Sequence, residues 1–151
     1  MNNFLIFINK LFNKKSFIIL IIIFFLKKFN IGSFETKLKF NVFKRTHYAY
    51  VCYQAAKLAK KLKIDSISIL EFGVAGGNGL VELEKYCVEL ENIFKIKIDI
   101  YGFDTGKGLP QPQDYRDLPY FYQKNFYKIN LKKINKKLNK AHLIIGDIKH
   151  T

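Results

Sequence analysis

The sequence predicts an α/β fold in which short parallel strands alternate with helices. Three features predict it: strand-length apolar runs near residues 66–72, 96–103 and 141–145, helical apolar periodicity between them, and a glycine-rich turn after the first run. Strands that are joined through helices run parallel, because each helix carries the chain back to the edge where the previous strand began. We therefore expect three parallel strands with helices, preceded by an apolar, basic N-terminal helix.

The stretch from Ser66 to Gly79, SISILEFGVAGGNG, is the centre of this prediction. Its apolar run, led by Ile67 and Ile69, is typical of a strand that is buried on both faces in the middle of a sheet. Four glycines follow and permit a tight turn and a close approach of a ligand to the backbone: Gly73, Gly76, Gly77 and Gly79. A helix then begins, and its predicted buried side chains recur every three or four residues: Leu80, Leu83, Cys87, Leu90 and Phe94.

This strand, glycine loop and helix have the order found in nucleotide-binding sites. Such a loop directs backbone N–H groups and the positive end of the helix dipole towards a ligand above the strand. A kinase or ATPase phosphate loop is excluded, because no lysine occurs between Gly73 and Glu84 and the later GFDTGKG segment has the wrong spacing. A dinucleotide fingerprint fits poorly, because Ala75 and Asn78 stand where it has glycine.

The pattern Glu71-x-Gly73-x-Ala75-x-Gly77 instead resembles the first motif of class I S-adenosylmethionine (SAM) methyltransferases. SAM carries a sulfonium and an ammonium group, so a carboxylate at the entrance of the loop suits it electrostatically. Ala75 replaces the glycine that is commoner at its position. A purely structural turn between strand and helix is the alternative interpretation of the same residues.

The positive charge is concentrated in the N-terminal part of the chain. Of 151 residues with a net charge of +14, residues 1–63 hold thirteen of the 26 lysines and arginines against one acid, Glu35. The length allows one domain with a sizeable core. The two cysteines, Cys52 and Cys87, provide neither a disulfide framework nor zinc spacing. We expect buried reduced thiols, no metal site and a cytoplasmic protein.

Residues 1–30 are apolar with flanking lysines. The uncharged run from Phe17 to Leu26 has ten residues, against about twenty for a membrane-spanning helix. Three interpretations stay open: a membrane-surface contact or marginal membrane anchor, a helix buried in the protein or in an oligomer contact, and a cleaved signal peptide. The lysines favour the first, since they attract anionic lipid head groups. No recognition motif supports a nucleic-acid partner.

Two further elements are predicted around the glycine loop. A helix near residues 48–63 carries apolar side chains at helical spacing, which we expect to form its buried face: Val51, Ala55, Leu58 and Leu62. The second strand, IKIDIYGFD, ends at Asp104. In nucleotide-binding α/β folds an acid there accepts hydrogen bonds from ribose hydroxyls, and an ordinary turn aspartate is the competing interpretation.

The rest of the chain predicts a binding loop and a third strand. Residues 105–126 contain all three prolines and several aromatic residues, and loops of this length tend to bind ligands or act as lids. Within the loop, Arg116 and Asp117 would orient a polar acceptor or, as we favour, pair with each other. A short lysine-rich helix and the strand AHLIIGD follow, and Asp147 and Ile148 stand at the carboxyl end of that strand.

Longer segments extend the resemblance. Together with the glycine loop, four further segments resemble bacterial class I SAM-dependent methyltransferases related to the macrocin O-methyltransferase group, which methylates sugar hydroxyls. The segments are IGSFETKL, HYAYVCYQAAKLAKKL, IYGFDTGKGLPQPQDYRDLP and LIIGDIKHT. The resemblance covers residues 31–151 and implies a partial Rossmann-like methyltransferase sheet. It implies SAM as the cofactor, with the methionine end, the ribose and the adenine held in that order by these residues: Glu71, Gly73, Ala75 and Gly77; Asp104; Asp147 and Ile148.

The family's sheet has seven strands, and this sequence supplies three. No catalytic residue can be carried over, because the family's metal-binding acidic motif and its base follow the fourth strand. We expect the SAM-binding half of an enzyme that methylates a sugar or glycan hydroxyl: a truncated product, an incomplete record, or one partner of a split enzyme whose second chain supplies strands 4–7. The alternative is a non-catalytic or partner-completed, membrane-associated nucleotide- or SAM-binding module. We expect a cytoplasmic location, peripheral at the inner face of the membrane through residues 1–30.

Overall fold

The computed structural model describes residues 14–149, with side chains from Ser16 onward, and divides into two compact units at Thr46. The first unit ends at Thr46 and the second runs from His47. The division falls after the boundary at residue 30 that the sequence suggests. Of the predicted segments, residues 1–13 and 150–151 lie outside the described residues.

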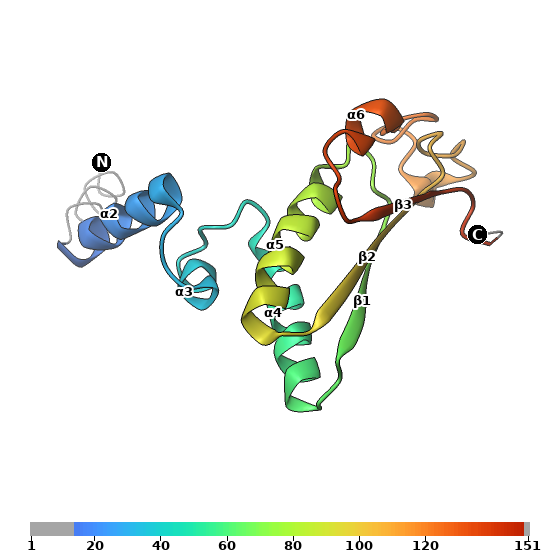
Figure 1. Ribbon diagram of the computed structural model, residues 1–151. Helices are drawn as coiled ribbons and strands as arrows, with labels where there is room; N and C mark the ends of the chain where they lie inside the picture. Colours follow the sequence, from blue (N-terminus) through green and yellow to red (C-terminus); the bar gives the residue numbers. More distant parts are fainter. Residues whose placement is uncertain (1–13, 150–151) are drawn as a thin grey trace, which may run out of the picture. The chain divides into compact units, whose positions relative to one another are not determined.

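The first unit contains two helices, α2 (Lys14–Phe29) and α3 (Phe34–Lys39), joined by a tight corner (Figure 1). Ser33 starts α3, because its Oγ accepts the backbone N–H of Thr36 at 3.1 Å. Phe34 is buried and its ring centroid lies 4.6 Å from that of Phe43. Among the described residues, no helix combines the length and the apolarity that crossing a bilayer requires.

The second unit contains an all-parallel sheet, as predicted. Its strands are β1 (Ser66–Phe72), β2 (Lys97–Asp104) and β3 (His142–Ile145), in the order β1-β2-β3. Helix α4 (Thr46–Lys61) precedes β1, and α5 (Asn78–Phe94) joins β1 to β2. A 3-10 turn, η1 (Tyr115–Asp117), and the short helix α6 (Leu131–Asn135) lie between β2 and β3. Phe72 pairs with Phe103 and Asp104 with Ile145, so the strands end at one common edge.

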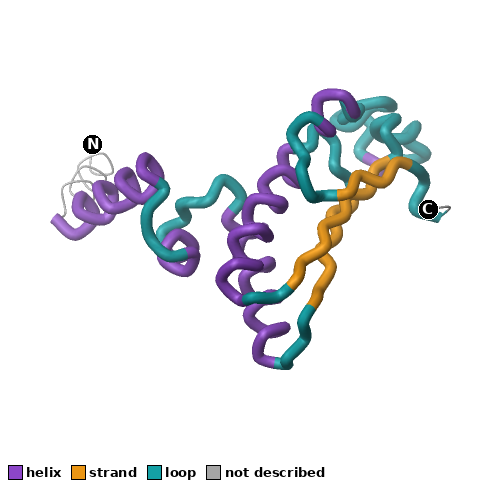
Figure 2. The backbone as a smooth tube through the Cα atoms, in the orientation of Figure 1, coloured by secondary structure: helices purple, strands orange, loops and turns teal. Residues whose placement is uncertain are grey.

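Within the described residues of this unit, only one face of the sheet is covered. The prediction that β1 is buried on both faces is therefore wrong. On β2 the side chains of Ile98 and Ile100 are fully buried, whereas on β1 Leu70 is 50% and Phe72 61% exposed. Figure 2 shows α4 and α5 on the same side of the strands. β1 is also an edge strand in the described sheet, not a central one. An apolar run predicts that both faces are covered, but whether they are covered depends on the rest of the fold.

The buried face of helix α4 consists mainly of small residues. Its buried side chains recur at helical spacing: Ala49, Cys52, Tyr53, Ala56 and Ala59. The predicted face is wrong, because Val51, Leu58 and Leu62 are all more than half exposed. The larger apolar side chains are left on the outer side of α4.

The two cysteines meet where α4 crosses α5. Both thiols are free and buried, as predicted, and the Cys52 thiol is hydrogen-bonded to that of Cys87. The hydrogen bond to Cys52 and burial raise the pKa of the Cys87 thiol, so this thiol stays protonated at neutral pH. The rings of Tyr53 and Phe94 extend the same contact, with centroids 5.5 Å apart.

Glu84 on α5 fixes the start of β3. Its buried carboxylate accepts the backbone N–H groups of Asn139 at 3.0 Å, Lys140 at 2.9 Å and Ala141 at 2.8 Å. Burial acts to raise the pKa of this carboxyl, but the three backbone donors outweigh burial and hold the pKa below its ordinary value. A charged side chain on α5 thus positions the turn from which the third strand begins.

Candidate functional site

The glycine loop turns sharply through three residues with left-handed backbone. The φ angles are +83° at Gly73, +48° at Ala75 and +78° at Gly77. The pairing of β1 with β2 extends to Gly73, whose backbone N–H donates to the Phe103 carbonyl at 2.8 Å. A left-handed φ is strained for alanine and free of strain for glycine, which is a physical reason for glycine to be commoner at the position of Ala75.

The carboxylate of Asp104 clasps this loop to the end of β2. Its Oδ2 accepts the backbone N–H of Ala75 at 2.9 Å, and its Oδ1 accepts the backbone N–H of Gly106 at 2.7 Å. Asp104 is therefore more than a turn residue, because it joins two loops that are far apart in sequence. Each oxygen keeps a second lone pair for a further donor.

The first glycines of the loop have free space beside them, whereas Gly77 is covered by another part of the protein. A Cβ atom built on Gly73 or Gly76 would meet no atom within 4 Å. A Cβ on Gly77 would lie 2.6 Å from the side chain of Ile134, which belongs to α6 and is buried. Space for a ligand thus exists beside Gly73 and Gly76, while the Cα of Gly77 is covered by the protein itself.

Glu71 points to the helix side of the sheet and lies under the first turn of α5. Its Oε1 accepts the hydroxyl of Tyr48 at 3.0 Å, and a Cβ built on Gly79 would lie 2.0 Å from the same oxygen. The carboxylate is buried and close to the positive end of the α5 dipole. Glu71 can therefore influence a cation at the loop through its field, but its contacts are with α4 and α5.

A hollow of about 350 Å³ runs along the outer edge of β1 beside α4. Its walls include Ile69 and Glu71 from the covered face of β1, and Leu70 and Phe72 from the exposed face. Because side chains from both faces line it, the hollow opens at the edge of the strand itself. Val51 on the outer side of α4 also lines it.

The end of β3 lies beside Asp104. The backbone N–H of Gly146 donates to the Asp104 carbonyl at 3.0 Å. Asp147 is exposed, and its Oδ1 accepts the backbone N–H of Lys149 at 3.0 Å. Ile148 is exposed as well. The structure thus brings Gly73, Ala75, Asp104 and the start of the Asp147 segment to one edge of the sheet, and it places the Glu71 carboxylate below that edge.

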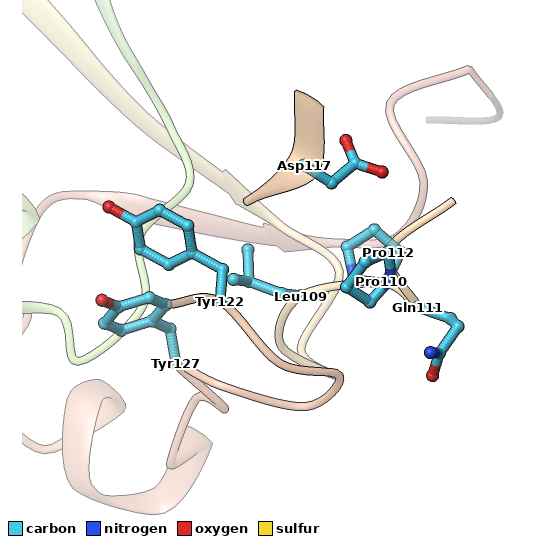
Figure 3. A pocket seen from close by; sticks show the side chains of 7 residues that line it. All are labelled: Leu109, Pro110, Gln111, Pro112, Asp117, Tyr122 and Tyr127. Carbon is cyan, nitrogen blue, oxygen red and sulfur yellow. The ribbon is translucent and has the colours of Figure 1, made fainter. Parts of the chain in front are cut away.

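The loop after β2 is folded upon itself around a second cavity. The Leu109 N–H donates to the Phe126 carbonyl at 2.8 Å, and the Asn125 N–H donates to the Leu109 carbonyl at 2.9 Å. Figure 3 shows the cavity, of about 330 Å³, between the rings of Tyr122 and Tyr127 on one side and prolines on the other. Its walls are mostly apolar, which is typical of sites for small organic ligands.

Arg116 pairs with Asp114, and the favoured pairing of Arg116 with Asp117 is wrong. The guanidinium Nη2 lies 2.5 Å from the Asp114 carboxylate, and this hydrogen bond holds the pKa of the Asp114 carboxyl below its usual range. Asp117 accepts the Gln113 N–H at 2.7 Å and lines the cavity. Neighbouring positions in sequence did not indicate which acid the arginine would reach.

Three residues of the site could not be foreseen from the motif. Tyr48 reaches Glu71 from α4, Ile134 covers Gly77, and Glu84 holds the start of β3. The only available signal was at Glu84, a charged residue among the apolar positions of an amphipathic helix. Within residues 14–149 no three metal-ligating side chains come together.

Comparison with known proteins gives no family for this chain. No family model matches the sequence, and neither the curated proteins nor the solved structures contain a significant match.

Proposed function

We propose that the second unit is the SAM-binding half of a methyltransferase that acts on a sugar or glycan hydroxyl. The observation that carries the proposal is the clasp of Asp104 on the glycine loop, beside open space at Gly73 and Gly76. In parallel α/β sheets, ligands bind at the carboxyl ends of the strands, where this clasp lies.

The residues at this edge fit SAM in part. The open backbone at Gly73 and Gly76 would hold the methionine portion, and the free lone pairs of the Asp104 carboxylate would accept the ribose hydroxyls. Asp147 and Ile148 would flank the adenine. Glu71 would act on the ammonium and sulfonium charges through its electrostatic field, since its carboxylate is buried and accepts the Tyr48 hydroxyl. When bound, SAM would supply an electrophilic methyl group for attack by the acceptor oxygen, with S-adenosylhomocysteine as the leaving group.

The proposal includes further polypeptide that completes the sheet along β1. The support is the unpartnered edge of β1 in the described sheet, the hollow beside it, and the exposed side chains of Leu70 and Phe72. An open, apolar strand edge is a template for pairing with another strand. A second chain or another part of a longer chain would supply strands 4–7 and the groups that orient the acceptor.

We further propose that the loop of residues 105–130 takes part in holding the acceptor, because it follows β2 at the same edge and contains the tyrosine-lined cavity. The proposed location is the cytoplasm, with residues 1–30 peripheral to the inner face of the membrane.

Isothermal titration of SAM and S-adenosylhomocysteine into the full chain tests the proposal. We expect binding that Asp104→Ala abolishes and that Asp99→Ala retains. Asp99 is the matched control, since it also lies on β2 and its carboxylate pairs with the exposed ammonium group of Lys97 at 3.0 Å. A folded protein that binds neither compound, or that binds equally well without the Asp104 carboxylate, would contradict it.

A further inference from the structure

Helix α2 exposes apolar side chains on every side. Phe17, Ile18, Ile19, Leu20, Ile21 and Ile22 are consecutive, and each is 37–59% exposed. Successive residues of an α-helix point about 100° apart, so six in a row cover the whole circumference. Phe24, Phe25 and Phe29 continue the exposed apolar surface towards the end of the helix.

This distribution indicates what covers the helix. A groove in one partner protein would cover a stripe of side chains and would leave a polar face towards water. No polar face exists between Phe17 and Leu26. The surroundings that suit such a helix are apolar on all sides, as the acyl chains of a lipid bilayer are.

The position of the lysines indicates how the helix lies. Lys14 and Lys15 precede the apolar run, and Lys27 and Lys28 follow it. Ten helical residues are about 15 Å long, whereas the hydrocarbon core of a bilayer is about 30 Å thick. The apolar run is thus about half as long as the hydrocarbon core is thick, which favours a position with both lysine pairs at the same surface.

We propose that α2 lies within one leaflet of an anionic membrane, parallel to its surface, with its lysines at the lipid phosphates. The Lys28 ammonium lies 5.4 Å from the ring centre of Phe24 and 5.6 Å from that of Phe29. The charged group therefore lies beside aromatic rings that would enter the lipid, as expected for a lysine at a membrane surface. The corner at Gly32, where Leu26 packs, turns the chain out of the lipid towards α3. This proposal does not depend on the methyltransferase assignment.

The test measures binding of the full chain to vesicles of phosphatidylcholine alone and of phosphatidylcholine mixed with phosphatidylglycerol. We expect preferential binding to the anionic vesicles that weakens with added salt. Lys27→Gln with Lys28→Gln should weaken that binding roughly ten- to thirtyfold. The matched control, Lys60→Gln with Lys61→Gln, removes the same charge from the last turn of α4 and should change binding by less than about threefold. Leu20→Ser with Phe24→Ser should abolish binding to both vesicles.

The orientation is measured with tryptophan, which the natural sequence lacks. Phe17→Trp, Ile22→Trp and Phe25→Trp each introduce one reporter. Lipids brominated near the head groups should quench all three more strongly than lipids brominated near the chain ends. A steady increase of depth from Phe17 to Phe25, equal binding by the Lys27/Lys28 variant, or self-association without vesicle binding would each overturn the proposal.

Discussion

The carboxylate of Asp104, at the end of β2, accepts the backbone N–H of Ala75 in the glycine loop at 2.9 Å. The same carboxylate accepts the backbone N–H of Gly106. One side chain therefore fixes the conformation of two loops at the carboxyl edge of the sheet. A residue that organises the loop in this way also presents its remaining lone pairs at the place where a ribose would bind.

Removal of the Asp104 carboxylate should loosen both loops. We expect Asp104→Ala to lower the free energy of unfolding by about 2–3 kcal/mol, since two charge-assisted hydrogen bonds are lost. Amide hydrogen exchange should accelerate at Ala75 and Gly106. Asp99→Ala should leave both rates unchanged. Equal exchange in the Asp104→Ala variant and the wild type would show that the clasp is absent in solution.

Ala75→Gly should stabilise the protein. Ala75 has a φ of +48°, where glycine is free of the strain that alanine carries. We expect the free energy of unfolding to rise by about 1 kcal/mol, less the entropy that the extra freedom of glycine costs in the unfolded chain. Ala59→Gly within α4 is the opposite control and should destabilise by about 1 kcal/mol. Denaturant midpoints measure both, and a lower midpoint for Ala75→Gly would be inconsistent with the left-handed conformation.

The Glu84 carboxylate should make stability depend on pH. Its pKa is depressed in the folded protein, so its contribution is fully present above the ordinary glutamate pKa of about 4.3 and is lost as the pH falls through the lower folded-state value. Glu84→Gln should cost about 2 kcal/mol at neutral pH, and the difference from wild type should shrink towards acid pH. Chemical denaturation across this pH range measures it. A constant difference would mean that charge is not what holds Asn139 to Ala141.

The exposed face of the sheet should tolerate substitution. Phe72→Thr removes an exposed side chain whose main ring contact is Phe103, with centroids 5.2 Å apart, and should cost at most about 1 kcal/mol. Ile100→Thr on the covered face should cost more than about 2 kcal/mol, because it buries a hydroxyl in an apolar core. Similar losses in denaturant unfolding would mean that the Phe72 face is covered in solution.

The sequence was sufficient for the elements and insufficient for their surroundings. The spacing of apolar residues predicted β1, α5, β2 and β3, and the glycines predicted the turn between β1 and α5. These features are local, since the pattern of a strand or helix depends on residues that are close together in the sequence. The same patterns failed at Val51, Leu58 and Phe72, whose exposure depends on what lies opposite them.

In the candidate site, too, the sequence predicted the positions of residues along the chain but not their contacts. Asp104 could be placed at the edge of the sheet, because it ends a strand that had to be parallel to β1. The sequence did not show that Asp104 would bind Ala75, that Ile134 would cover Gly77, or that Glu71 would face Tyr48. Each of these contacts joins residues from different elements, so it depends on tertiary packing that no local pattern records.

The measurement that tests the central claim most directly is a titration of the isotopically labelled full chain with S-adenosylhomocysteine, followed by amide NMR. The SAM half-site predicts shifts at Gly73, Ala75, Gly76 and Gly106, with smaller ones from Gly146 to Ile148. For a half-site, we expect affinity on the order of millimolar. Shifts confined to the cavity between Leu109 and Tyr127, or unchanged amides around Ala75 at saturating ligand concentrations, would contradict the account.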